Sequence, residues 1–200
     1  MGRRICRNVV FVGCGVSRCQ PTLVNLYPGQ PGSAVAYGED NLQALKSEFP
    51  DLVWSTFREE TRCVVSREQQ FELLAFLKNT QGFDLLVDIT CVDYLNFRDA
   101  VDRFGLVYLL ANTVTNERLN VRCFVNEPEL NVRSVASLWL GANWMEREVW
   151  DMFGIQFEGH PDHRRILLPE EFTAHPLRKD YPLRGRGERH NFPVLERGAS

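Results

Sequence analysis

Residues 160–169 read HPDHRRILLP, and they place side chains that can bind metals or move protons beside paired arginines. Histidine nitrogens and aspartate oxygens are common zinc ligands, so His160, Asp162 and His163 could support a metal-dependent hydrolase. The His-x-Asp-His spacing is not a standard metal motif, however, and a proline restrains the backbone between the ligands. We favour a structural role, in which His160 and His175 hydrogen-bond turn amides that extended chain leaves unpaired.

Charged residues lie on both sides of this stretch. Glu146, Arg147 and Glu148 could do acid–base chemistry, form a solvated helix face or pair with charges on another protein, and the last two interpretations stay open. The basic residues between positions 164 and 179 stand among Leu and Pro, and arginine pairs well with carboxylates, which favours an interface. The candidate partner-binding residues are Glu146, Arg147, Glu148, Asp151, His160, Asp162, Arg164, Arg165, His175, Arg178, Lys179, Asp180 and Tyr181.

Composition argues against several other classes of protein. The net charge of −3 provides no basic field for nucleic acid. No apolar run approaches the ~20 residues that span a bilayer, so membrane contact is expected only through a partner. None of the six cysteines has C-x-x-C spacing, so we expect no iron–sulfur cluster or metal site in this chain. No G-x-G-x-x-G loop is present for a nucleotide.

The upstream pattern predicts the elements that position these side chains. Apolar residues recur at helical spacing over 40–49, and a second helix is expected between the capping pair Ser66–Gln69 and Gly82. Strands are expected at 51–57, 62–66, 83–95, 103–114 and 118–126. The run at 103–114 is the most continuously apolar, which suits a central strand.

Two further helices are predicted, one at 131–142 and one that Asn143 caps and Gly154 ends. The second should turn Met145, Val149, Met152 and Phe153 to the core, and Trp144 and Trp150 are expected there too. This order of elements predicts an α+β fold with a mixed or antiparallel sheet and helices packed on one face.

The sequence changes character after Phe157. Five of the ten prolines and all four histidines lie beyond it, which indicates extended chain with turns. Such chain cannot bury its own apolar residues, so they must dock on the domain or on another protein. We therefore divide the chain into an irregular tail (1–35), an α+β domain (36–158) and an extended, proline-rich, partner-binding segment (159–200), called the strap below.

Residues 146–183 resemble the signature of the 30-kDa subunit family of respiratory complex I, which in bacteria is the C-type subunit of NADH-quinone oxidoreductase. The motifs EREVWDMFGI, GHPDHRRIL and HPLRKDYPL occur in the family's order and spacing. Residues 38–145 also resemble the family in size and element order. Three positions depart from its pattern: His163 replaces a usual Leu, Phe172 a common Trp, and Ala174 a common Gly.

The resemblance implies a non-catalytic structural and assembly subunit in the peripheral arm of proton-translocating NADH:quinone oxidoreductase. That enzyme passes electrons from NADH through FMN and iron–sulfur clusters, held by other subunits, to a quinone. The implied partners are the quinone-site subunit (49-kDa, D-like) and the terminal-cluster subunit (B-like). The implied location is peripheral, on the cytoplasmic side of the cell inner membrane. The alternative is the equivalent subunit of a membrane-bound hydrogenase-type complex.

Overall fold

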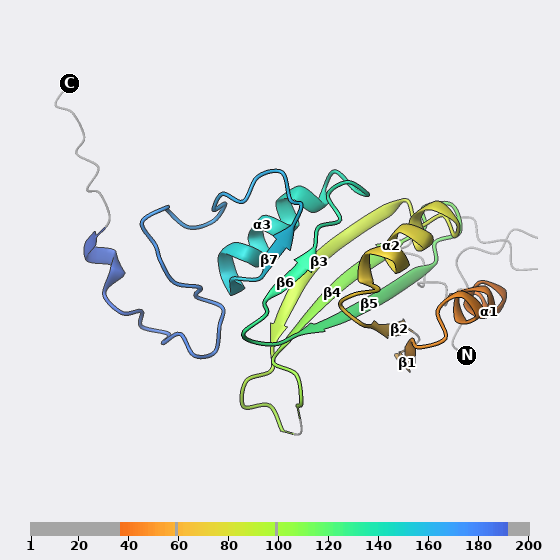
Figure 1. Cartoon of the computed structure of the whole chain (residues 1–200), viewed down its shortest axis with the longest axis horizontal. Helices are drawn as coiled ribbons and strands as arrows, with labels where there is room; N and C mark the ends of the chain where they lie inside the picture. Colours follow the sequence, from red (N-terminus) through yellow and green to blue (C-terminus); the bar gives the residue numbers. More distant parts are fainter. Residues whose placement is uncertain (1–36, 59, 99, 192–200) are drawn as a thin grey trace, which may run out of the picture. The chain divides into compact units, whose positions relative to one another are not determined.

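The computed structural model of the chain describes residues 37–58, 60–98 and 100–191 (Figure 1). Its elements are α1 (Glu39–Glu48), β1 (Val53–Phe57), β2 (Glu60–Val65), α2 (Gln70–Asn79), β3 (Leu85–Asp93), β4 (Phe104–Ala111), β5 (Arg118–Val125), β6 (Asn131–Arg133), α3 (Ala142–Phe153), β7 (Gln156–Glu158) and the 3-10 helix η1 (Glu188–Asn191). The predicted tail, 1–35, lies outside the described residues, as do strap residues 192–200. Among the described helices, none has the length and apolar character needed to cross a membrane.

Five strands form the main sheet in the order β1-β2-β5-β4-β3. β2 and β5 run parallel, and the other neighbours are antiparallel. Within β4, Tyr108 lies opposite Val121 of β5 and Ile89 of β3. The most apolar strand is therefore internal, as predicted, and the mixed sheet with its helices confirms the α+β class.

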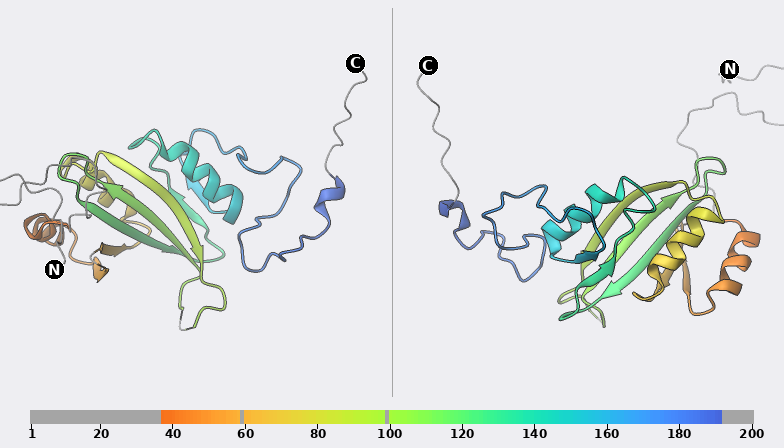
Figure 2. Two further views of the ribbon diagram at one scale, coloured as in Figure 1. Left: turned by 180° about the vertical axis from the view of Figure 1, so that it is seen from behind. Right: turned by 45° about the horizontal axis from the view of Figure 1, so that its top comes forward.

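Alternating burial along the strands gives the sheet one covered face. Val121 and Cys123 of β5 are buried, while Arg122 between them turns to the other side. α2 buries Leu73, Leu74 and Leu77 in the same hydrophobic cluster. The view from behind in Figure 2 shows β3, β4 and β5 with no described helix in front of them. The helices thus gather on one face of the sheet.

The helix predicted for residues 131–142 is wrong. The chain there forms the short strand β6, which pairs in parallel with β7 and places Val132 opposite Phe157. A turn follows, in which the Trp139 amide donates to the Val135 carbonyl over 3.0 Å. The apolar residues whose spacing suggested a helix are buried in other ways, Val132 in the strand and Val135 and Trp139 in the turn.

Three expectations about α3 also need correction. The helix begins at Ala142 without a side-chain cap, so Asn143 lies inside its first turn. Trp144 is 62% exposed and does not join the core. Glu146, for which a solvated helix face was one interpretation, is fully buried instead. The predicted end at Gly154 is confirmed, because this residue is the C-cap and adopts a left-handed φ of 79°.

Candidate functional site

Asp151, in α3, holds the strap to the domain. Its side chain is fully buried, and its Oδ2 accepts the amides of Ile166, Leu167 and Leu168 over 3.1, 2.9 and 3.0 Å. Its Oδ1 accepts from Arg165 Nη1 over 2.5 Å. Burial alone would raise the pKa of Asp151, but these hydrogen bonds outweigh it and hold the pKa below its usual range. One carboxylate thus satisfies three amides that have no strand partner.

Arg147 binds backbone carbonyls at the start of the same stretch, whereas Asp151 binds backbone amides. Its Nε donates to the Arg164 carbonyl over 2.9 Å, and its Nη2 donates to the Arg165 carbonyl over 3.0 Å. Residues four apart on a helix lie on one face, so Arg147 and Asp151 present a donor and an acceptor side by side. α3 therefore binds both the carbonyls and the amides of the docked strap.

The C-terminal end of α3 is capped by a later part of the strap. His175 Nδ1 lies 3.0 Å from the Asp151 carbonyl, the Leu177 amide donates to the Met152 carbonyl over 3.2 Å, and Arg178 Nε donates to the Phe153 carbonyl over 2.5 Å. Carbonyls in the last turn of a helix have no partner within the helix. The positive charge of Arg178 also suits the negative end of the helix dipole.

Gly154 makes room for this cap. A Cβ atom at this position would lie 2.6 Å from Nε2 of His175 and 3.0 Å from Nη2 of Arg178. The residue's positive φ is also one that side-chain-bearing residues seldom adopt. Glycine is required here both by backbone conformation and by the closeness of the strap.

A buried polar cluster anchors the beginning of the strap. Oε1 of Glu146 accepts the Val135 amide over 2.7 Å, and its Oε2 accepts the Ser134 hydroxyl over 2.6 Å. His160 Nε2 lies 3.8 Å from the same Oε2. Burial raises the pKa of Glu146 to about 7, although the two hydrogen bonds oppose the shift. This contact explains why Glu146 neither caps α3 nor faces solvent.

His160 is held as a neutral ring. Its Nδ1 accepts the Asp162 amide over 3.0 Å, so its proton resides on Nε2, which is 3.1 Å from the Asn143 carbonyl. Burial lowers the pKa of His160, which favours this uncharged form. His163, at a position that departs from the family pattern, stacks edge-on against Trp150 and lies 2.9 Å from a backbone carbonyl. The predicted bonding to a turn amide is confirmed for His160, whereas the His175 ring contacts the Asp151 carbonyl instead of an amide.

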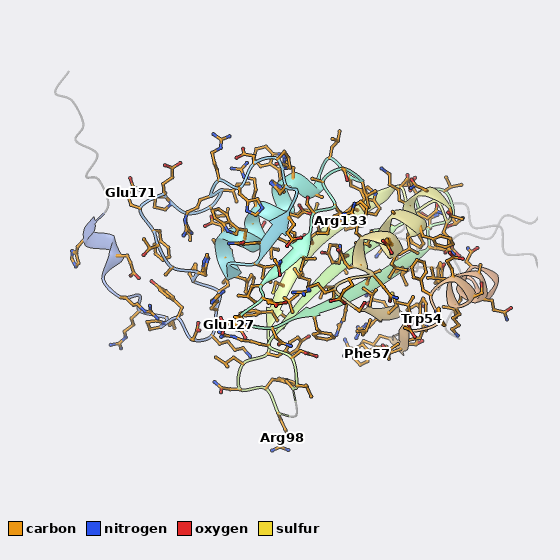
Figure 3. The ribbon with its side chains drawn as sticks, viewed as in Figure 1. Trp54, Phe57, Arg98, Glu127, Arg133 and Glu171 are labelled. Atoms are coloured by element: carbon orange, nitrogen blue, oxygen red, sulfur yellow. The ribbon has the colours of Figure 1, made fainter. Side chains whose placement is uncertain are left out.

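A second cluster fixes the strap near the end of the sheet. Arg103 donates to Glu127 over 2.8 Å and to Asp180 over 2.7 Å, while Asp93 accepts the Lys179 amide over 2.9 Å. Glu127, labelled in Figure 3, also accepts from Nη1 of Arg178. Arg103, Asp93 and Glu127 were not among the predicted site residues, because no local pattern links them to the strap.

The remaining predicted site residues lie at the surface. The Arg164 side chain is 73% exposed, and its ion pair within the described part of the chain is with neighbouring Asp162, over 2.7 Å. Glu148 and Lys179 are exposed, and Tyr181 packs against Phe172 with ring centroids 5.9 Å apart. The structure thus uses many of the predicted residues to dock the strap on this chain's own α3. Their contact with a partner stays a prediction.

The described residues contain no cluster of three or more His, Cys, Asp or Glu side chains that could hold a metal ion. A metal-dependent hydrolase would use His160 and Asp162 as metal ligands, but both ring nitrogens of His160 already have hydrogen-bond partners. The Asp162 carboxylate is held by Arg164. Cys63, Cys91 and Cys123 are buried free thiols.

Residues 63–187 match the family model described as the respiratory-chain NADH dehydrogenase 30 Kd subunit. The NADH-quinone oxidoreductase C-type subunit of Geobacter metallireducens is 44% identical over 131 residues, which cover 66% of this chain and 80% of the relative. NADH-quinone oxidoreductase subunit 5 of Thermus thermophilus is 46% identical over 126 residues, 60% of each chain.

Two solved structures are similar to this chain. A trypsin-resistant fragment of Nqo5 matches with a TM-score of 0.57 at 35% identity, covering 62% of this chain and 97% of the fragment. A chain of an archaeal membrane-bound sulfane sulfur reductase has a TM-score of 0.65 at 23% identity, covering 81% of this chain and 95% of that one, and shows the fold alone. The match over residues 63–187 and the 44% identity to the Geobacter metallireducens subunit place the chain in the family of the 30-kDa subunit of respiratory-chain NADH dehydrogenase.

Proposed function

We propose that this chain is a non-catalytic structural subunit in the peripheral arm of proton-translocating NADH:quinone oxidoreductase. The relatives that carry this enzyme's name support membership of the complex. The lack of an active site in this chain is supported by the contacts between α3 and the strap, which engage Asp151 and Arg147 of α3 and His160 and His175 of the strap. These signature residues therefore act by keeping the strap docked on α3.

The observation that carries this proposal is the outward display of apolar side chains from a strap that α3 holds in place. Leu167 and Leu177 are 59% and 53% exposed, and Leu183 is fully exposed. The backbone amides of the first two donate to α3, Leu167 to the Asp151 carboxylate and Leu177 to the Met152 carbonyl. Burying such side chains contributes about 25 cal/mol per Å² of apolar surface. Because the backbone is already ordered, less entropy is lost when a partner covers them.

The proposed partners follow from the family. They are the quinone-site subunit, which is the 49-kDa or D-like member of the complex, and the terminal-cluster subunit, which is the B-like member. FMN and the iron–sulfur clusters are assigned to partner subunits. The complex would place this chain at the cytoplasmic side of the cell inner membrane, in contact with the membrane only through its partners.

The test is a triple variant, Leu167→Asp, Leu177→Asp and Leu183→Asp, expressed in the full chain. We expect the melting temperature of the isolated chain to stay near that of the unaltered protein, because these side chains are exposed. Co-purification with the other subunits and NADH-to-quinone turnover in membranes should fall at least tenfold. Val114→Asp, at an exposed position in the β4–β5 turn, is the matched control. Full turnover by the triple variant would contradict the proposal.

The same purification identifies the parent complex. Mass spectrometry of the bound proteins should find the flavin-bearing and NADH-site subunits. Recovery of a nickel-binding large subunit in their place would assign the chain to a hydrogenase-type complex.

A further inference from the structure

The face of the main sheet opposite the helices carries a second set of features that docking of the strap does not explain. Along β5, Arg118, Asn120, Arg122 and Phe124 alternate with the buried residues and turn to this face. No described helix covers β3, β4 and β5 on this side (Figure 2). A sheet face open to water normally carries mostly polar side chains.

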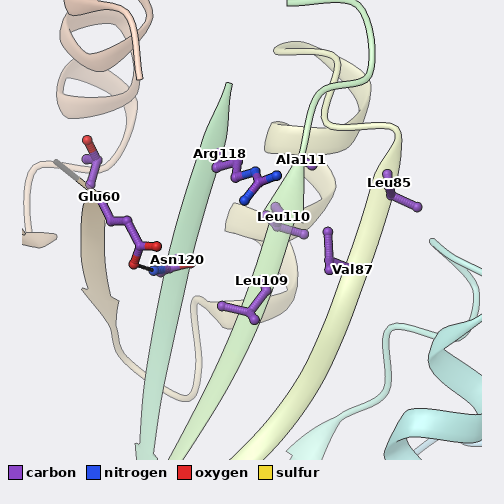
Figure 4. Close-up of a pocket in the computed structure, with 9 residues that line it drawn as sticks. Glu60, Leu85, Val87, Leu109, Leu110, Ala111, Arg118 and Asn120 are labelled. Carbon is purple, nitrogen blue, oxygen red and sulfur yellow. Dashed lines mark hydrogen bonds between the residues drawn. The ribbon is translucent and has the colours of Figure 1, made fainter. Parts of the chain in front are cut away.

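This face is instead hollowed and largely apolar at its centre. A groove of about 410 Å³ lies over β3, β4 and β5, and Leu85, Val87 and Leu109 contribute side chains to it (Figure 4). Leu85 and Val87 are 46% and 49% exposed, so β3 presents apolar surface to solvent here. Glu60 and Asn120, hydrogen-bonded over 3.1 Å, form its polar border. The groove has the apolar centre and polar edge of a protein interface.

Arg118 lines the groove, and Arg122, two residues beyond Asn120 on β5, lines a neighbouring hollow. Arg118 and Arg122 take part in no ion pair among the residues that the structure describes. Nε of Arg122 is buried without an acceptor, and so is Nε of Arg62, whose guanidinium approaches Glu60 at 3.7 Å. Buried charged donors without acceptors are rare in folded proteins because they forgo hydrogen bonds to water. Such arginines are suited to a carboxylate that comes from outside the described chain.

We propose that this groove binds a segment of another subunit of the complex, one that inserts apolar side chains between Leu85, Val87 and Leu109 and places a carboxylate against Arg122. The site lies on the face of the sheet opposite the helices and does not involve the strap contacts. It therefore adds a second, independent interface to the proposed function.

Charge argues against two other occupants. Residues 1–36 contain four arginines, no aspartate and no glutamate, so they cannot supply the carboxylate. A second copy related by two-fold symmetry would set one face that carries Arg118 and Arg122 against another, so arginines near the axis would repel each other. An acidic partner protein avoids both problems.

A photo-crosslinking residue at Val87, in the full chain within the assembled complex, tests which molecule lies in the groove. We expect a cross-link to a different subunit, on a peptide that contains Asp or Glu among apolar residues. The same residue at Val114 should give at least tenfold less of that product. A cross-link to another copy of this chain, to residues 1–36 or to residues 192–200, which include Glu196, would overturn the proposal, as would no cross-link.

Charge variants test the carboxylate separately. Arg122→Glu should lower recovery of the assembled complex at least tenfold, while Arg122→Lys, which keeps the charge, should lower it severalfold less. The melting temperature of the isolated chain should not fall with either variant, because Arg122 forms no ion pair among the described residues. If Arg122→Glu lowers the melting temperature, its effect on assembly could reflect lost stability, and assembly is then measured with Val87→Asp instead. Unchanged assembly in Arg122→Glu or Val87→Asp, with the strap intact, would refute this interface and leave the strap proposal standing.

Discussion

Arg147 and Asp151, four residues apart on α3, bind the backbone carbonyls and the backbone amides, respectively, of one short stretch of the strap. Arg147 donates to two carbonyls at positions 164 and 165, and Asp151 accepts three amides at positions 166–168. Extended chain without a strand partner is thereby satisfied by two side chains of a helix. The backbone groups of residues 164–168 thus find partners within this chain, which leaves the apolar side chains of the strap for partner subunits.

Asp151→Asn should lower the free energy of unfolding by about 2–4 kcal/mol, because an amide offers one acceptor atom and loses the charge paired with Arg165. Urea denaturation of the full chain measures this. Glu148→Gln, an exposed carboxylate on the same helix, should change stability by less than about 0.5 kcal/mol. Equal effects of the two substitutions would contradict the role assigned to Asp151.

Gly154→Ala should destabilise the protein more than Gly159→Ala. Both glycines have φ near 80°, but a Cβ at Gly154 meets His175 while one at Gly159 meets nothing within 4 Å. The difference between the two losses should be about 1 kcal/mol or more, since it isolates the steric displacement of the strap. Calorimetric melting of both variants gives the comparison. Equal losses would mean that His175 does not pack against Gly154.

Stability should depend on pH through Glu146. Its pKa in the folded protein is about 7, above the ordinary value of 4.5 in the unfolded chain. The folded state therefore holds an extra proton between these values, and the contribution of Glu146 is lost as the pH rises from 4.5 to 7. Glu146→Gln mimics the protonated acid and removes this loss, which amounts to roughly 3 kcal/mol.

The check is the difference in unfolding free energy between Glu146→Gln and the unaltered chain at pH 4.5 and pH 8. Relative to the unaltered chain, the variant should have a higher unfolding free energy at pH 8 than it has at pH 4.5. His160 and His175 act in the opposite direction in both proteins, because their lowered pKa values cost stability as the pH falls below about 6.5. A difference that does not change with pH would mean that Glu146 stays ionised.

Arg164→Ala should reduce assembly of the complex more than it reduces the melting temperature of the isolated chain. The Arg164 guanidinium is exposed and its one ion pair is to Asp162, two residues away. Exposed pairs of this kind contribute about 0–1 kcal/mol to stability. A large loss of stability in the isolated chain would place Arg164 in the structural core of the strap instead.

Much of the sheet could be predicted from the sequence because each strand alternates or is continuously apolar, as β4 is. The helix predicted at 131–142 failed because Val132, Val135 and Trp139 have helical spacing but are buried by pairing with β7 and by a turn. Tertiary pairing overrode the local pattern.

The candidate site was predictable in its residues but not in their partners. Arg103 and Asp180 are 77 positions apart, so no local pattern connects them. Glu146 and Asp151 look like solvated charges in the sequence, yet both are fully buried. Their burial depends on acceptors and donors that only the folded chain brings near, such as Ser134 and the amides at 166–168.

Hydrogen exchange at the amides of Ile166, Leu167 and Leu168, measured in the isolated full chain, tests most directly whether α3 holds the strap. We expect all three to exchange at least about a hundredfold more slowly than unprotected amides, and Asp151→Asn to abolish the protection. Unprotected exchange at these three amides in the unaltered chain would show that the strap does not dock on α3 without a partner.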